Sequence, residues 1–165
     1  MTSRVREIQT QFPADGYVEW IGVRPARGVA VNSVQACELS REAGIIGDRF
    51  QGPQGAKRQV TLIQQEHLEV IARLLGHDRI DPGLTRRNLV VRGINLIALK
   101  GQHFQIGSAI LQATGACAPC SKMEEALGAG GFNAMRGHGG ITACVIQDGQ
   151  IKVGDPVSYR HRDDS

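Results

Sequence analysis

Two cysteines separated by two residues, Cys117 and Cys120, carry the most reactive side chains in the sequence. The thiolate is the reactive form of cysteine, and the free N–H groups at the start of a helix stabilise it. The segment Ser121-Lys122-Met123-Glu124 has the capping-box pattern, which predicts a short helix that begins just after Cys120. Cys120 is therefore the better-placed thiol, and Lys122 supplies a positive charge near it.

Three interpretations of this Cys-x-x-Cys pair stay open at this level. A redox dithiol of the thioredoxin kind needs a βαβ context, which the surrounding sequence lacks. A zinc site needs two more ligands, and His138 is the one histidine in a nearby loop. The third interpretation is a pair of loop cysteines without any chemical role.

Two arginine-bearing segments precede the cysteines. Arg86, Arg87 and Asn88 offer planar, permanently charged donors that suit phosphate or carboxylate, or else a solvated surface pair. Arg49 and Arg58 flank a glycine-rich stretch. The neighbouring Asp48 either orients one of these arginines or caps backbone N–H groups in a structural turn.

A third polar segment follows the cysteines, and it consists of Arg136, Gly137, His138 and Gly139, with Gly140 behind them. Glycines around a histidine let the backbone approach a ligand closely or present N–H groups to an anion. The alternative is a flexible connection between strands. His138 has the pKa range of an acid or base, although no partner for it can be inferred.

The elements expected to position these residues are mostly strands. Gly reaches 21 residues while the aromatic residues are four Phe, two Tyr and one Trp, which favours many tight turns over a helical bundle. Apolar residues recur at helical spacing only from Gln65 to Leu75, with Gly76 as the C-terminal cap. A second short helix is expected from Ser121 to the glycines at 128–131.

Nine or ten short strands are expected between Tyr17 and Tyr159, and they include Ile97–Leu99. Asp148-Gly149 predicts a hairpin between Ile141–Gln147 and Gln150–Val153. The predicted fold class is mainly β: an antiparallel, closed or partly open β-barrel with two or three short helices.

Composition excludes several classes of function. A net charge of +3 with few aromatic residues argues against nucleic-acid binding, and no apolar run is long enough to cross a membrane. The first fifteen residues lack the apolar core of a secretory signal, so we expect a cytoplasmic protein. The length predicts one domain over residues 1–165, with a core at about 17–159 and frayed polar ends.

Six segments occur in an order that is more specific than any one of them: GIIGDRFQG at 44–52, RQVTLI at 58–63, PGLTRRNLVVRG at 82–93, LKGQHFQIG at 99–107, APCSK at 118–122, and residues 137–155, ending in DGQIKVGDP. This series resembles the MOSC domain, the C-terminal module of molybdenum cofactor sulfurases. It also resembles small stand-alone bacterial members of that family. The resemblance covers nearly the whole chain, and it implies a barrel similar to the β-domain of pyruvate kinase.

The resemblance also implies roles for residues. The hallmark cysteine of the family falls on Cys120, which would ligate molybdenum or carry sulfur as a persulfide. The residues that would then surround the pterin and its phosphates in the molybdenum cofactor (molybdopterin) are Arg49, Arg58, Arg86, Arg87, Asn88, Lys122, Arg136, Gly137, His138 and Gly139. Arg87 stands where the family often has Glu. Cys117 lies outside the family pattern, and a reversible disulfide between it and Cys120 would switch off a metal ligand.

Three functions follow from the resemblance. The first is a reductase of N-hydroxylated small-molecule substrates, which would need a separate reductase as electron donor, since no flavin, haem or iron–sulfur motif is present. The second is a sulfur carrier, which would need a cysteine desulfurase partner because the chain has no pyridoxal phosphate domain. The third is a module that binds the cofactor without chemistry.

Overall fold

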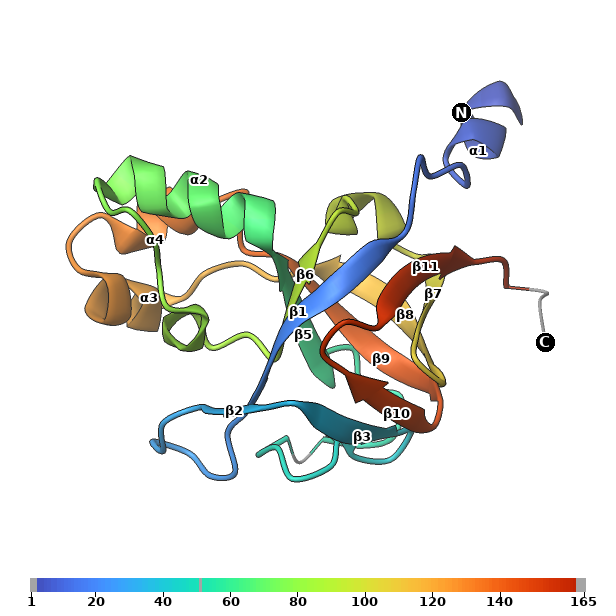
Figure 1. Ribbon diagram of the computed structural model, residues 1–165, viewed down its shortest axis with the longest axis horizontal. Helices are drawn as coiled ribbons and strands as arrows, with labels where there is room; N and C mark the ends of the chain where they lie inside the picture. The colour runs from blue at the N-terminus through green and yellow to red at the C-terminus, as the bar shows by residue number, and fades with distance from the viewer. Residues whose placement is uncertain (1–2, 51, 163–165) are drawn as a thin grey trace.

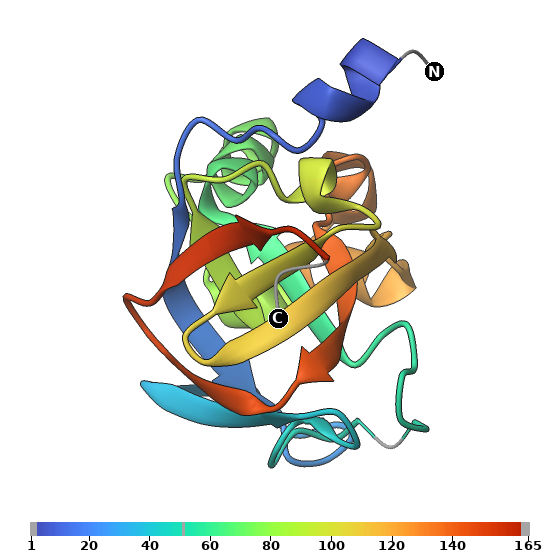
Figure 2. The same ribbon diagram turned by 90° about the vertical axis from the view of Figure 1, so that its right-hand side faces the viewer.

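The computed structural model describes residues 3–50 and 52–162, and its centre is a closed β-barrel (Figures 1 and 2). Seven strands close the barrel in the order β11-β7-β8-β9-β5-β6-β1, and β1 pairs with β11 to complete the ring. All neighbours are antiparallel except β5 and β6. The seven strands are β1 (Gly16–Val23), β5 (Val60–Gln64), β6 (Leu89–Arg92), β7 (His103–Ile106), β8 (Ala109–Ala116), β9 (Ile141–Gln147) and β11 (Pro156–Arg160). The expected mainly β barrel is thus confirmed.

Aliphatic side chains fill the barrel. Val18 and Ile21 of β1, Phe104 of β7 and Leu111 of β8 point into one continuous core and are almost fully buried. Inward positions of this kind alternate along a strand with outward ones, so burial switches from residue to residue. β5 is an exception because all five of its residues are buried, which means that both of its faces are covered.

Helices cover the outer face of β5 at Ile63, near the C-terminal end of the strand. Helix α2 (Gln65–Leu75) makes the crossover from β5 to its parallel neighbour β6, as a parallel pair requires. Its buried stripe of Leu68, Ile71 and Ala72 packs in a second apolar cluster that also contains Met123. The predicted range of this helix is confirmed, including Gly76 as its left-handed C-cap at φ 74°.

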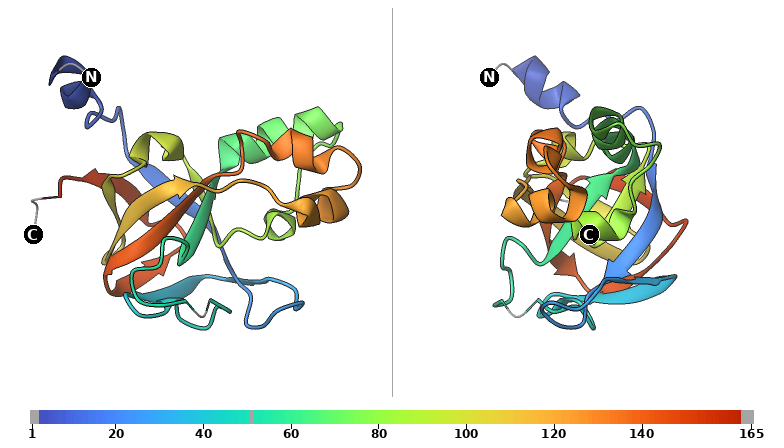
Figure 3. Two further views of the ribbon diagram at one scale, coloured as in Figure 1. Left: turned by 180° about the vertical axis from the view of Figure 1, so that it is seen from behind. Right: turned by 90° about the vertical axis from the view of Figure 1, so that its left-hand side faces the viewer.

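Helices α2, α3 (Ser121–Leu127) and α4 (Gly131–Met135) gather at one end of the barrel (Figure 3). The start of α3 after Cys120 agrees with the expectation, but no side-chain cap bond forms there. Glu124 instead accepts the backbone N–H of Phe132 in α4 at 3.1 Å. The glycines at 128–131 were expected only to end a helix, yet they connect two helices.

Two predicted elements are wrong. The Asp148-Gly149 hairpin does not form, because β10 (Gly149–Lys152) pairs with β3 (Ala36–Ser40) rather than with β9. Ile97–Leu99 is not a strand but belongs to the 3₁₀ helix η2 (Leu96–Leu99). Local patterns set a turn or an apolar run, whereas the choice of partner depends on distant segments.

The remaining elements lie around the barrel. β10, β3 and β4 (Gly44–Ile45) form a small second sheet, β2 (Asn32–Val34) extends the large sheet beside β1, and η1 (Pro82–Thr85) precedes β6. Helix α1 (Ser3–Ile8) buries no side chain and projects from the body (Figure 1). None of the helices within residues 3–50 and 52–162 has the length and apolar character needed to span a bilayer.

Candidate functional site

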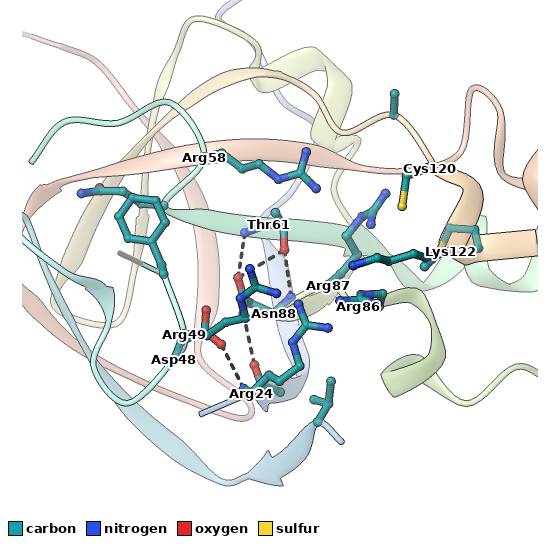
Figure 4. A pocket seen from close by; sticks show the side chains of 16 residues that line it. Arg24, Asp48, Arg49, Arg58, Thr61, Arg86, Arg87, Asn88, Cys120 and Lys122 are labelled. Atoms are coloured by element: carbon teal, nitrogen blue, oxygen red, sulfur yellow. Dashed lines mark hydrogen bonds between the residues drawn. The ribbon is translucent and has the colours of Figure 1, made fainter. Parts of the chain in front are cut away.

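A cavity of about 460 Å³ opens between the barrel and the helical end. Figure 4 shows its lining, in which cationic side chains and one thiol surround a polar floor. The lining residues are Gly22, Arg24, Val31, Asp48, Arg49, Phe50, Arg58, Gln59, Thr61, Arg86, Arg87, Asn88, Ala118, Cys120, Lys122 and Met123. Segments that are far apart in sequence therefore meet here: the end of β1, the start of β5, the loop after β4, the residues between η1 and β6, and the connection from β8 to α3.

Cys120 is the exposed thiol of the cavity. It is the N-cap of α3, where its carbonyl accepts the Met123 N–H at 2.9 Å and the buried Met123 side chain anchors the helix. Three residues earlier, the Cys117 N–H donates to the Gly140 carbonyl at 2.8 Å. The loop that carries Cys120 is therefore fixed at both ends.

The other cysteines differ from Cys120 in their surroundings. Cys117 is 1% exposed and Cys144 is 7% exposed. Burial, and secondarily the charge of Asp48, raises the pKa of the half-buried Cys37 to about 12. No disulfide joins these residues, and the proposed Cys117–Cys120 disulfide stays a prediction.

The cavity carries a large excess of positive charge. Arg24, Arg49, Arg58, Arg86 and Lys122 line it together with a single carboxylate. No salt bridge within the described part of the chain involves any of these cations. Like charges that outnumber their counter-charges in this way favour the binding of an anion.

The one carboxylate in the lining, Asp48, accepts a hydrogen bond from a backbone N–H group. Its Oδ1 accepts the Arg24 N–H at 2.9 Å, and the Arg49 N–H donates to the Arg24 carbonyl at 2.8 Å. This pair of bonds ties the end of β1 to the loop after β4. Burial lowers the pKa of Arg24, and the nearby charges of Arg86 and Arg49 lower it further. The charge of Asp48 acts in the opposite direction and raises the pKa of Arg24. Asp48 thus positions two arginines, and as a single carboxylate it leaves the cavity with an excess of positive charge.

Asn88 forms part of the cavity floor, and its side-chain amide is hydrogen-bonded to the neighbouring strands. Its Oδ1 accepts from the Thr61 N–H at 3.0 Å and the Thr61 hydroxyl at 3.2 Å, and its Nδ2 donates to the Gly22 carbonyl at 3.3 Å. These bonds join β1, β5 and β6 where the strands reach the cavity (Figure 4). The position of Asn88 suits a structural role better than direct contact with a ligand.

Arg87 differs from the other arginines because only 4% of its surface is exposed. Its guanidinium donates to three backbone carbonyls, those of Gly139 at 2.8 Å, Thr85 at 2.9 Å and Cys117 at 3.1 Å. Burial lowers the pKa of Arg87, while the neighbouring Cys117 acts in the opposite direction. Arg87 therefore lies at the back of the cavity wall.

The glycine-rich segment after α4 does not line the cavity. Arg136 and Gly137 are exposed to solvent away from the cavity lining. Gly139 is connected to the site indirectly, because its carbonyl accepts a hydrogen bond from Arg87. His138 turns away toward α2, where its ring meets that of His67 at a centroid distance of 5.3 Å. This segment was expected around an anionic ligand. Its place behind the cavity wall was not visible from its composition.

The His67–His138 contact predicts a stability that depends on pH. Burial, followed by the charge of His138, lowers the pKa of His67 in the folded state. The unfolded chain then binds the additional proton more readily, so stability is full above about pH 6.5 and falls as the pH drops below that value. We expect His67→Gln to flatten this slope of unfolding free energy, measured by urea titration between pH 7.5 and 5. An unchanged slope would contradict the assignment.

Arg86 holds a strained backbone conformation. Its φ of 61° makes it the one non-glycine residue with positive φ among the described residues, and this conformation costs an L-residue about 1 kcal/mol. We expect Arg86→Gly to raise Tm by about 2 °C and to weaken the binding of inorganic pyrophosphate. Calorimetric unfolding and titration calorimetry measure the two effects. A variant that loses stability, or that binds pyrophosphate as the wild type does, would refute the expectation.

Arg24 is the functional candidate that sequence reasoning missed. It lies at the end of β1, far in sequence from every motif, and only the bonds through Asp48 bring it beside Arg49 and Arg86. No group of three or more His, Cys, Asp or Glu side chains suited to a metal ion occurs in the parts of the chain that the structure covers. A metal bound here would have to bring most of its own ligands.

The chain is thus a closed β-barrel with a cationic, thiol-bearing cavity at its helical end. The chain is a member of the MOSC domain family, whose model matches residues 47–158. Arg24 lies outside the matched range. No curated protein matches the sequence.

Several solved structures share the fold of this chain. The YuaD protein from Bacillus subtilis superposes with a TM-score of 0.75 at 20% identity, over 91% of this chain and 100% of that one. YiiM from Geobacillus stearothermophilus gives 0.73 at 18% identity, over 91% and 77% of the two chains. YiiM from Escherichia coli gives 0.70 at 21% identity, over 93% and 73%. These likenesses establish the fold.

Proposed function

We propose that this protein binds the molybdenum cofactor in the cationic cavity, with the Cys120 thiolate as the protein ligand of the metal. The observation that carries the proposal is the combination of one exposed thiol with six cations and a single carboxylate in the lining of a cavity of about 460 Å³. Thiolate is a soft ligand of the kind that thiophilic metals prefer. Arginine and lysine are the usual partners of phosphate.

The residues of the cavity fit such a ligand in different ways. Arg24, Arg49 and Arg86 interact with one another across a small region and would hold the phosphate end. Arg58 and Lys122 would contact the pterin or its phosphate from other sides of the cavity (Figure 4). When bound, the cofactor would supply a metal centre able to accept or release an oxygen atom.

The finer part of the proposal is a reductase of N-hydroxylated compounds. The chain has no sequence motif for a flavin, haem or iron–sulfur centre, so electrons would come from a separate protein. A sulfur carrier is the alternative, and the exposure of Cys120 favours it equally, because a persulfide must be reachable by both donor and acceptor. Persulfide on Cys120 after treatment with a cysteine desulfurase would favour the carrier.

The test of the proposal is purification from a host that makes the cofactor, followed by metal analysis and by fluorescence of the oxidised pterin. We expect molybdenum and pterin in near-equal amounts. Arg24→Gln combined with Arg49→Gln should lower the pterin content, whereas Arg73→Gln on the exposed face of α2 should leave it unchanged. Absence of both molybdenum and pterin from the wild type would refute the proposal.

A further inference from the structure

Arg87 is a buried cation that no carboxylate neutralises within residues 3–50 and 52–162. Its partners are three backbone carbonyls, and no described salt bridge includes it. Taking a guanidinium out of water costs several kcal/mol unless its donors are satisfied. Each of the three guanidinium nitrogens donates to one carbonyl oxygen, but carbonyls leave the net charge, so a positive charge remains inside the cavity wall.

The three carbonyls belong to three different segments of the chain. Thr85 ends η1, Cys117 begins the loop that carries Cys120, and Gly139 follows α4. The planar fork of arginine can reach all three, which the single ammonium of lysine cannot do. The arrangement also needs Gly139, because a Cβ there would lie under 3.0 Å from the Cys117 carbonyl and 3.2 Å from Nη2 of Arg87.

The guanidinium also lies close to the exposed thiol. Arg87 and Cys120 line the same cavity, and Figure 4 shows the guanidinium beside the sulfur. Burial and the charge of Arg58 lower the pKa of Arg87, whereas the proximity of Cys117 and Cys120 raises it. A fixed cation at this place attracts anionic molecules toward the sulfur and has no effect of that kind on neutral ones.

We propose that Arg87 is a positioning residue for Cys120: its three carbonyl bonds fix the loop that carries the thiol, and its charge gives the thiol a preference for anionic partners. The inference rests on Cys120 being the reactive group of the proposed function. Its test needs no molybdenum and no pterin, so either proposal can fail while the other holds.

The charge is tested by alkylating Cys120 with iodoacetate, which is anionic, and with iodoacetamide, which is neutral. Both reagents attack the same thiolate, so the ratio of their rates does not depend on how much thiolate is present. Peptide mass spectrometry assigns the label to Cys120. We expect Arg87→Met to lower the iodoacetate-to-iodoacetamide ratio about threefold, while Arg87→Lys keeps most of the ratio. The exposed Arg73→Met serves as the control and should not change it.

The clamp, meaning the three bonds from Arg87 to backbone carbonyls, is tested by amide hydrogen exchange of Cys117, Ala118 and Cys120. We expect faster exchange in Arg87→Lys and in Gly139→Ala, because each breaks the clamp while a positive charge stays at position 87. Should Arg87→Met not fold, Arg87→Gln removes the same charge, keeps a polar side chain, and should lower the alkylation ratio in the same way. A purely structural role would slow or speed both alkylations together, and an unchanged ratio in Arg87→Met would overturn the role of the charge. Unchanged exchange in both clamp variants would overturn the role of the bonds.

Discussion

Cys120→Ser should purify with less than about one tenth of the molybdenum of the wild type, while it keeps a substantial part of the pterin. The reason is that, in the proposed complex, two separate groups of residues would hold the two parts of the ligand. Cys120 would contribute the sulfur, whereas the arginines that line the cavity would contact phosphate independently of the thiol. A serine hydroxyl is a hard oxygen donor that stays protonated near neutral pH, so it replaces a thiolate poorly.

The measurement is metal content by mass spectrometry together with pterin fluorescence on the same preparations. Cys144→Ala is the matched control, because Cys144 is a buried cysteine of β9 that does not line the cavity. It should retain both molybdenum and pterin. Equal loss of both in Cys120→Ser would mean that the thiol holds the whole ligand. Equal retention of both would remove Cys120 from the metal site.

The fold was largely predictable because the spacing of apolar residues along the chain indicates its strands and its main helix. Gln65–Leu75 repeats apolar residues at helical spacing, and the helix has those bounds. The pairing of strands was less predictable. β10 pairs with β3, which lies more than a hundred residues earlier in the chain, and not with its sequence neighbour β9. A turn signal such as Asp148-Gly149 reports local geometry and carries no information on that distant partner.

The site was predictable in its residue types and less so in their roles. Arg49, Arg58, Arg86, Lys122 and Cys120 all line the cavity. Their part in binding stays a prediction. Tertiary contacts decide the rest, because the side chains of Arg87 and Asn88 are bonded to the scaffold, and His138 faces α2. Whether an arginine side chain faces a ligand or bonds to the backbone depends on how deeply tertiary packing buries it. The residues next to it in sequence do not indicate that burial.

Gly140→Ala should unfold the protein at much lower denaturant concentration than the wild type. A Cβ at this position would lie under 3.0 Å from the backbone carbonyl of Leu62 in β5, which is a part of the barrel that cannot move aside. The residue also has a φ of 88°, which a side chain disfavours. The overlap and the strain together should cost more than about 3 kcal/mol of unfolding free energy.

Gly137→Ala separates the two causes. Gly137 has a similar φ of 81°, but a Cβ there meets nothing within 4 Å, so only the conformational strain of about 1 kcal/mol applies. Urea unfolding followed by circular dichroism measures both variants. The difference between them is the effect of the overlap alone, and equal losses would show that the overlap relaxes at no cost. Because the Gly140 carbonyl accepts the Cys117 N–H at 2.8 Å, Gly140→Ala should also loosen the loop of Cys120, and Gly137→Ala should not.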